Sequence, residues 1–500
     1  MVVQHNMQAA NANRMLNVTT SAQSKSTEKL SSGYRINRAA DDAAGLTISE
    51  KMRKQIRGLD QASTNAQDGV SSVQTAEGAL TEVHSMLQRM NELATQAANG
   101  TNSKDSDRQA IQDEIDQLTT EIDRVSETTK FNETYLLKGE DGTKTINMKA
   151  HDAGLKGKLT DNGDGTATFV MDTLNAGDKV SIGGKSYTIG SDDAEVEKWF
   201  TDNGNDVKDE ATKKVTVNGT EYTYYAAKAA NTTAGSLTGW DAGWYASAPT
   251  DKGDGTGTAL SGKFANVDAI KAEVKKGATV QNGTKSVTGM NDTTPKDGVS
   301  DTDATVISKN KAYELASKEL LKANQIGDTE GNAQVGTGAD VDVAVDLTHG
   351  DGTFSIKVGQ AKVANSLAFS LHVGADADMT NKIQVNIDAM DSASLGIKGL
   401  NVKDDSGNAA TYAVDAISDA ISKVSSQRSA LGAVQNRLEH TINNLDNVVE
   451  NTTTAESRIR DTDMAEEMVN YSKNNILAQA GQSMLAQANQ SNKGVLSLLQ

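Results

Sequence analysis

The chain has 500 residues, of which 36% are hydrophobic and 4% aromatic, and its formal net charge is −18. This acidity argues against nucleic acid and anionic membrane surfaces as partners, because both are recognised through basic patches. The absence of cysteine excludes disulfides and thiolate metal sites. No apolar run is long enough to span a bilayer, and residues 1–16 contain no apolar stretch typical of a cleavable secretory signal. If the protein leaves the cell, another machine is expected to export it.

The first 30 residues are rich in Asn, Ser, Thr and Gln and show only a weak apolar pattern. Val3, Met7 and Ala10 share one helical face, and Leu16 adds apolar surface. Short polar side chains compete with helical hydrogen bonding, so the segment is expected to be poorly ordered alone. Packing against a neighbour would convert it into a helix.

A connector of mixed charge, residues 33–45, leads into the most regular stretch of the sequence. From Leu46 to Ala98, apolar residues recur at alternating spacings of three and four, which is typical of a coiled-coil seam. Gln55 and Gly69 are the interruptions. A continuous helix here would be roughly 80 Å long and would need partner helices along its length. The seam positions are Ile48, Met52, Gln55, Leu59, Ala62, Ala66, Gly69, Val73, Ala76, Leu80, Val83, Leu87, Met90, Ala94 and Ala97.

Two further segments repeat this rhythm. The first contains Ile111, Ile115, Leu118, Ile122 and Val125. The second contains Val414, Ile417, Ile421, Val424, Leu431, Leu438, Ile442, Leu445 and Val449, with Arg428 and Gln435 as polar breaks. Because the seams come from both ends of the chain, we expect a mainly α fold, a long antiparallel coiled coil or helical bundle built from both termini. An ordinary helical bundle with a large insert is the alternative.

The middle of the chain, from Gly139 to about Val363, has a different composition, dominated by Gly, Asp, Thr, Asn and Lys. Short alternating runs bounded by turn residues predict β-hairpins, and a helix is expected at Ala312–Ala323. The expected strand runs are Thr166–Met171, Lys179–Ile189, Lys214–Tyr225 and Val341–Leu347. This is a β-rich (α+β) insert, large enough for two subdomains. Its aromatic residues Trp240, Trp244 and Tyr245 are expected to fill a small core, with a glycan or ligand platform as the alternative.

The C-terminal segment resembles the N-terminal one in being weakly helical and apolar. Its apolar residues are Met464, Met468, Tyr471, Ile476, Leu477, Ala480, Met484, Leu485, Ala488, Val495, Leu496, Leu498 and Leu499. An exposed Leu-rich end is unusual for a soluble monomer. It either docks into its own bundle or packs between subunits, and the similarity of the two ends favours packing between subunits.

The residues that could carry chemistry form no catalytic pattern. None of the six histidines has a second histidine four residues away, so a helical zinc-protease pair is not expected. The stretch Asp161–Gly165 resembles a calcium loop superficially, but it has Gly where oxygen ligands are needed and is better explained as a hairpin turn. We therefore expect no enzymatic activity, no cofactor and no metal.

Several motifs in fixed order resemble bacterial flagellin. They are Lys29–Asn37, Ala40–Ile48, Asp68–Leu80, Leu93–Thr101, Ile111–Ile115, Glu121–Val125, Leu431–Leu438 and Val495–Leu499. The resemblance covers about residues 1–139 and 366–500, whereas the middle carries no family signature. It implies a secreted structural subunit that polymerises with copies of itself into the filament of the bacterial flagellum and is exported unfolded by the flagellar type III apparatus.

The resemblance also implies a division of labour along the chain. Residues 1–43 and 455–500 would form the inner filament core, and residues 44–139 and 366–454 an outer-tube bundle with a β-hairpin. Residues 140–365 would project into solvent. The implied partners besides other copies are an export chaperone, the filament cap protein and the hook–filament junction proteins. The residues expected to support polymerisation are Val3, Met7, Ala10, Leu16, Ile476, Leu477, Met484, Leu485, Val495, Leu496, Leu498 and Leu499.

Recognition by Toll-like receptor 5 of hosts is a further implication of the resemblance. The implied contact residues are Gln88, Arg89, Met90, Leu93, Gln96 and Glu114. The same side chains would alternatively serve subunit packing in the filament. Two other functions stay open at this point, a junction protein between hook and filament and a surface adhesin that uses the insert.

Overall fold

The computed structural model describes residues 6–101, 103, 106–228, 240–249, 264–293, 296–337, 352–404 and 407–497, except for the side chains of Thr337 and of residues 492–497. The chain divides into two compact units. The first unit contains Met1–Thr75, Ala368–Asn386 and Ser429–Gln500. The second unit contains Ala76–Leu367 and Ile387–Arg428.

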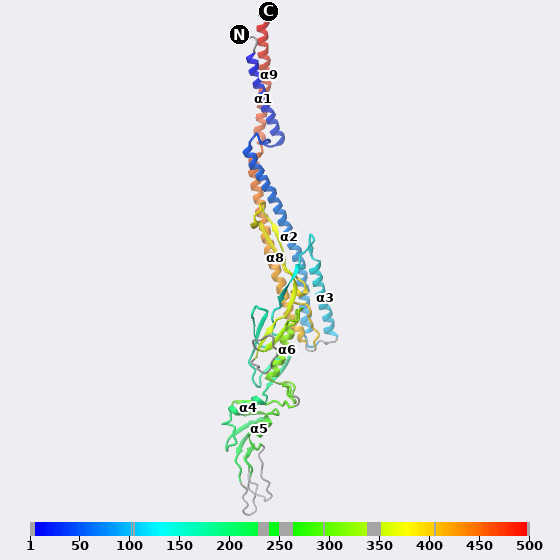
Figure 1. Cartoon of the computed structure of the whole chain (residues 1–500), viewed down its shortest axis with the longest axis vertical. Helices are drawn as coiled ribbons and strands as arrows, with labels where there is room; N and C mark the ends of the chain where they lie inside the picture. Colours follow the sequence, from blue (N-terminus) through cyan, green and yellow to red (C-terminus); the bar gives the residue numbers. More distant parts are fainter. Residues whose placement is uncertain are drawn as a thin grey trace, which may run out of the picture. The chain divides into compact units, whose positions relative to one another are not determined.

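Long helices come from both ends of the sequence, and strands and shorter helices come from the middle (Figure 1). The helices are α1 (Met7–Ser32), α2 (Ala43–Ala97), α3 (Asp107–Thr128), α4 (Asp193–Asp202), α5 (Val267–Val274), α6 (Lys309–Asn324), η2 (Met379–Asn381), α7 (Ser392–Leu395), α8 (Asn408–Arg460) and α9 (Met464–Ser497).

The strands are β1 (Lys130–Phe131), β2 (Thr134–Tyr135), β3 (Glu140–Asn147), β4 (Gly157–Asp161), β5 (Thr166–Met171), β6 (Lys179–Ile182), β7 (Lys185–Gly190), β8 (Lys214–Val217), β9 (Thr220–Tyr225), β10 (Gly243–Tyr245), β11 (Thr279–Asn282), β12 (Lys285–Thr288), β13 (Val306–Ser308), β14 (Gln334–Thr337), β15 (Thr353–Lys357), β16 (Gln360–Asn365), β17 (Leu367–His372) and β18 (Lys382–Ile387).

In the first unit, the two terminal helices α1 and α9 lie side by side and run antiparallel (Figure 1). The direction follows from two contacts. The Asn6 side chain donates to the carbonyl of Ala488 over 3.2 Å, and Lys29 pairs with Glu467 at the other end of the pair over 3.7 Å. The weakly helical segments at the two ends of the sequence are therefore both helices, and each covers part of the other.

The first part of α2 packs antiparallel against the last part of α8 in the same unit. Ser63 donates to Asp446 over 3.1 Å, and Ser49 donates to Glu456 over 2.7 Å. The predicted seam is wrong at its beginning, because Ile48 is 46% exposed while its neighbour Ser49 is fully buried. Gln55 is likewise exposed, and Ile56 takes the inward position. The contact stripe has shifted by one residue there, since 3.6 residues per turn do not match a strict three–four alternation.

The hairpin of β17 and β18 packs on this coiled coil and explains the glycine in the seam. Leu371 approaches α2 at Gly69, where an added Cβ would lie 2.2 Å from Leu371 Cδ1 and 3.3 Å from Leu438 Cδ1. The side chains of Ala66, Val373, Ile383 and Leu438 form the buried cluster around this point, and Leu371 packs against it. The break at Gly69 is therefore the place where the hairpin enters the seam.

The second unit holds the more strongly buried part of the seam. Leu80, Val83 and Leu87 of α2 and Ile115 and Ile122 of α3 have no exposed surface. The third predicted seam is also present, because Ile417, Val424, Leu431 and Leu438 of α8 are buried within their respective units. The periodic segments are thus helices that pack through their predicted apolar stripes.

Two polar side chains in the N-terminal part of α3 hydrogen-bond to neighbouring backbone. The guanidinium of Arg108, 2% exposed, donates to the carbonyl of Ala97 over 3.0 Å and to that of Asp404 over 2.7 Å. The amide of Gln112 donates to the Leu400 carbonyl and accepts from the Val402 N–H. Buried polar groups that are paired in this way hold the C-terminal end of α2 and the chain before α8 against α3.

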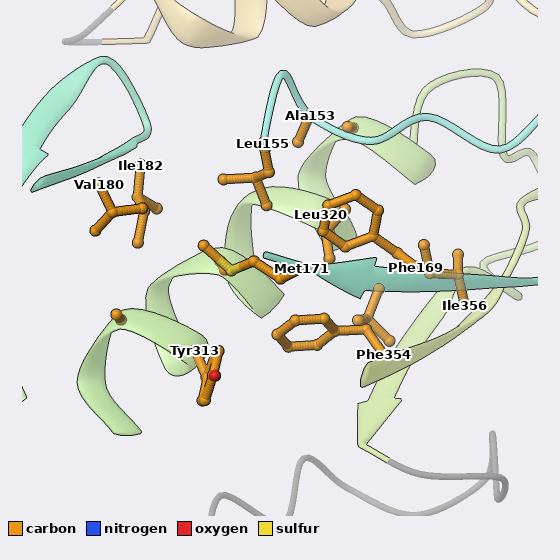
Figure 2. Packing of buried hydrophobic residues seen from close by; sticks show 14 of the residues in the cluster. Ala153, Leu155, Phe169, Met171, Val180, Ile182, Tyr313, Leu320, Phe354 and Ile356 are labelled. Carbon is orange, nitrogen blue, oxygen red and sulfur yellow. The ribbon is translucent and has the colours of Figure 1, made fainter. Parts of the chain in front are cut away.

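The insert enters and leaves as one antiparallel pair, β3 with β16. Beyond it, the sheet β14-β15-β5-β4 and the sheet β13-β7-β6 pack with α6 around one core. Figure 2 shows this core, in which Phe354 lies between Phe169 and Tyr313, with ring centroids 6.2 Å and 6.0 Å apart. Met171 of β5 and Leu320 of α6 pack into the same core (Figure 2).

A second core forms on the sheet β10-β9-β8-β11-β12, which α4 and α5 cover. Trp244 is fully buried there, and its indole N–H donates to Asp209 over 2.8 Å. Trp240, which we expected in the same core, instead lies half-buried outside it with the Lys228 ammonium 4.8 Å from its ring centroid. The hairpins of β6 with β7 and β8 with β9 confirm the predicted strand runs, and α6 confirms the predicted helix. The run Val341–Leu347 lies outside the described residues.

Candidate assembly interface

The interior of the α1–α9 pair is built from small side chains. Ser26 and Ala478 are 4% and 8% exposed, and a Cβ added at Gly481 would lie 3.3 Å from Leu16 Cδ1. Leu16 and Leu485 are half-buried. Small residues let the two helices approach closely, so the pair closes without using most of its large apolar side chains.

Those large side chains are exposed to solvent instead. Met7 is 74% exposed, Ile476 66%, Met484 64% and Leu477 47%, and Ala10 is exposed as well. Isolated exposed apolar residues are ordinary, but a group of this size on one helix pair marks an interaction surface. Among the residues predicted for polymerisation, Val3, Val495, Leu496, Leu498 and Leu499 lie outside the described side chains.

The structure adds residues that the prediction left out of this surface. Met15, Val18, Met464, Met468 and Val469 are each at least half exposed. Val469 and Ile476 are seven residues apart, so the heptad spacing was a signal that pointed to Val469. The others were visible as apolar residues in the sequence, but nothing in their spacing distinguishes an outward from an inward position.

A joint of polar contacts connects α1 to α2 and α8 to α9 within the first unit. Tyr34 bridges Asp461 through backbone pairing, and the Arg460 guanidinium lies 4.9 Å from the Tyr34 ring centroid. Arg460 also donates to Glu50 over 2.9 Å. The connection between α1 and α2 therefore lies beside the connection between α8 and α9. These contacts fix one end of the α1–α9 pair, and the apolar surface of the pair stays exposed.

The residues expected to contact a receptor fall into two groups. Arg89 is exposed and its guanidinium donates to Glu114 over 2.9 Å, and Gln88 and Gln96 are exposed on the same helix. Hydrogen bonds to Glu114 and Glu92, together with the charge of Glu114, raise the pKa of Arg89. The structure corrects the expected arrangement at Met90 and Leu93, which are 0% and 2% exposed. They lie on the buried stripe that leads to Ala97 and support the exposed pair from beneath.

Other features that the sequence singled out carry no reaction chemistry. The stretch Asp161–Gly165 is the turn between β4 and β5, and Asp164 accepts from the Thr166 backbone and hydroxyl. Among the described residues, no cluster of three or more His, Asp or Glu side chains is arranged to hold a metal ion. Within the same part of the chain, no helix combines the length and the apolarity needed to cross a membrane.

Paired terminal helices with an uncovered apolar surface, set on an antiparallel coiled coil, define a structural subunit of an assembly. Comparison with known proteins gives the family. The family model for the bacterial flagellin N-terminal helical region matches residues 3–141, and the model for the C-terminal helical region matches residues 414–499.

Whole proteins match as well. A flagellin of Clostridium tyrobutyricum is 36% identical over 494 residues, which cover 98% of this chain and 99% of that protein. A flagellin of Bacillus subtilis is 33% identical over 500 residues, the full length of both chains. This chain belongs to the bacterial flagellin family, whose members are structural subunits of the motility filament. Among solved structures, FliC from Burkholderia pseudomallei is 19% identical with a TM-score of 0.26, covering 74% of this chain and 99% of that one, too loose a superposition to add to the fold.

Proposed function

We propose that the α1–α9 pair is the part of this flagellin that drives polymerisation, through the exposed side chains of Met7, Ala10, Ile476, Leu477 and Met484. The half-buried Leu16 and Leu485 would complete the surface at its edge. The observation that carries the proposal is the exposure of large apolar side chains on a helix pair whose own interior is made of small ones. At roughly 25 cal/mol per Å², a few hundred Å² buried against each neighbour contributes several kcal/mol before ordering costs.

The same proposal assigns parts of the chain to layers of the filament. Residues 1–43 and 455–500 form the inner core, residues 44–139 and 366–454 the outer tube, and residues 140–365 the solvent-facing insert. Val3, Val495, Leu496, Leu498 and Leu499 belong to the inner core in this scheme. The change from apolar terminal helices to a Gly- and Asp-rich middle supports the division.

The test replaces apolar by polar side chains on the proposed surface. Ile476→Ser with Met484→Ser should give a folded subunit that no longer polymerises, because the surface loses two of its large apolar groups. Val170→Ser is the matched control, since Val170 is 45% exposed but lies on β5 of the insert. Sedimentation and electron microscopy measure filament yield, and normal filaments from the Ile476/Met484 variant would refute the proposal.

Export, by our proposal, occurs in the unfolded state through the flagellar type III apparatus, which makes the filament extracellular. An export chaperone would hold the apolar C-terminal helix before export, and the cap and hook–filament junction proteins would contact the same terminal helices during assembly. The composition supports passage as an unfolded chain. There is no cysteine to form a disulfide, and with only two prolines in 500 residues, slow proline isomerisation affects few peptide bonds. Crosslinking of α9 to a chaperone in cell extracts tests this part.

Recognition by Toll-like receptor 5 is the second proposed role. The exposed Arg89–Glu114 pair, with Gln88 and Gln96 beside it, supports a polar contact face, and Met90 and Leu93 would keep its backbone in place. Arg89→Ala should reduce signalling in a receptor reporter assay. The control Arg124→Ala removes another exposed arginine, paired with Glu121 on α3, and should leave signalling unchanged. Equal signalling from both variants would contradict the assignment.

A further inference from the structure

Four cations gather on the first part of α2 without partners of their own. They are Lys51, Arg53, Lys54 and Arg57, all exposed. None of them forms an ion pair or a side-chain hydrogen bond with the described residues, although elsewhere many lysines and arginines of this chain do. We call these four residues the basic patch.

The patch has a local cost, because like charges three and four residues apart repel each other along a helix. Arg53 and Arg57 are four apart, and Lys51 and Lys54 are three apart. The chain as a whole has 67 acidic and 49 basic residues, so four exposed cations within seven residues contrast with its overall negative charge. Solvent exposure does not by itself favour placing like charges close together on a helix. The grouping therefore points to an anionic binding partner.

A surface of matching charge lies on α3. Seven of its 22 residues are acidic, and its two arginines do not balance them, because Arg108 is buried and Arg124 is paired with Glu121. Asp113, Asp116 and Glu127 are exposed and have no cationic partner among the described residues. The side-chain carboxylates of Asp113 and Asp116 accept hydrogen bonds from the neutral side-chain amides of Gln109 and Gln112. We call Asp113, Asp116 and Glu127 the acidic face.

We propose that the basic patch of one subunit binds the acidic face of α3 on a second copy of this chain. Two different surfaces that complement each other make a head-to-tail contact, and such a contact continues into an open helical array when the rotation does not close. That is the geometry a filament requires. The contact lies outside the terminal helices, so it acts in addition to the apolar surface of α1 and α9.

Charges at such a contact set register and partner choice more than total affinity. Single exposed pairs are worth little, but several cations facing several carboxylates are brought together at once by the apolar contacts of the terminal helices. Repulsion between copies that each carry a net charge of −18 is reduced where opposite charges face each other.

The experiment reverses each surface separately and then together in the full-length chain. The first variant carries Arg53→Glu, Lys54→Glu and Arg57→Glu. The second carries Asp113→Lys, Asp116→Lys and Glu127→Lys. The third carries all six changes. The control variant carries Lys156→Glu, Lys158→Glu and Lys179→Glu, three exposed lysines of the insert without ion pairs to the described residues, and changes the net charge as much as the first variant does.

Far-UV circular dichroism first establishes that the free subunits keep their helices. The critical concentration for polymerisation is then measured by sedimentation. It should rise about tenfold or more for the first and second variants. The third variant and the control should polymerise like the parent. Polymerisation of the first variant at the parental concentration would overturn the proposal, and so would an equal defect in the control, which would mean general repulsion.

Failure of the six-residue variant to recover would also overturn the proposal, because the partner surface would then not be α3. The result is separate from the test of the terminal helices, since the Ile476/Met484 variant has no charge change and cannot be restored by these reversals. If one triple variant loses helix, the single changes Arg57→Glu and Asp113→Lys replace the triple variants. Each alone should raise the critical concentration, and the two combined should restore it.

Discussion

Replacing Gly69 by alanine should destabilise the first unit, although alanine is the better helix former. An added Cβ would lie 2.2 Å from Leu371 Cδ1 and 3.3 Å from Leu438 Cδ1, so the hairpin side chain must move. Overpacking of this kind costs about 1–3 kcal/mol. The helix propensity of alanine returns at most about 1 kcal/mol. Even after the full propensity gain is subtracted, we therefore expect a net loss of up to about 2 kcal/mol in the free energy of unfolding.

Gly78→Ala on the same helix is the matched control. A Cβ at Gly78 would have no neighbour within 4 Å. Only the propensity term then applies, and the variant should gain up to about 1 kcal/mol. The two substitutions are chemically identical and should differ in sign.

Hydrogen exchange of the amides in residues 62–76 and 371–385 measures the local stability of the first unit, and thermal unfolding followed by circular dichroism gives the global effect. Gly69→Ala should speed exchange in both segments, and Gly69→Ala with Leu371→Ala should recover protection in α2. Stabilisation by Gly69→Ala to the same extent as by Gly78→Ala would refute the idea that Leu371 requires a glycine at this position.

Three further predictions concern the second unit. Arg108→Met should lower the free energy of unfolding by about 3–5 kcal/mol in urea titrations, because the Ala97 and Asp404 carbonyls lose their donors. The control Arg124→Met, at an exposed ion pair, should cost under about 1 kcal/mol. Similar losses for the two variants would contradict the structural role of Arg108. Burial lowers the pKa of His151, so the folded state favours the neutral ring, and the melting temperature should fall as the pH drops below about 6.5. His151→Asn should reduce this dependence of melting temperature on pH. An unchanged dependence in the variant would show that His151 does not cause it. Trp244→Ala should lower the free energy of unfolding of the insert by about 3–5 kcal/mol. In limited proteolysis the sheet β10-β9-β8-β11-β12 should then be cleaved first, and resistance of this sheet equal to that of the parent protein would contradict the prediction.

Periodicity in the sequence was sufficient to predict the helices and their buried stripes from Ala62 to Ala97 and from Ile417 to Leu438. Alternation and turn residues were sufficient for the hairpins of the insert, including the one closed by Asn218 and Gly219, which both have positive φ. These features depend on local geometry, since a residue's position along a helix or strand fixes which side of it the residue occupies. The same local rule predicted that the terminal segments carry apolar surface.

The sequence alone could not assign which apolar residues meet a partner within the chain. Ser49 is inward and Ile48 outward, and the buried Ser49 hydroxyl donates to Glu456, which lies about 400 residues later in the chain. Met90 and Leu93 are hidden although they adjoin the exposed Arg89, and Gly69 is a glycine because Leu371, about 300 residues later in the chain, packs there. Periodicity therefore determined which elements form and which stripe each can bury, whereas long-range packing decided what fills that stripe, because a side chain's exposure depends on atoms far away in the sequence.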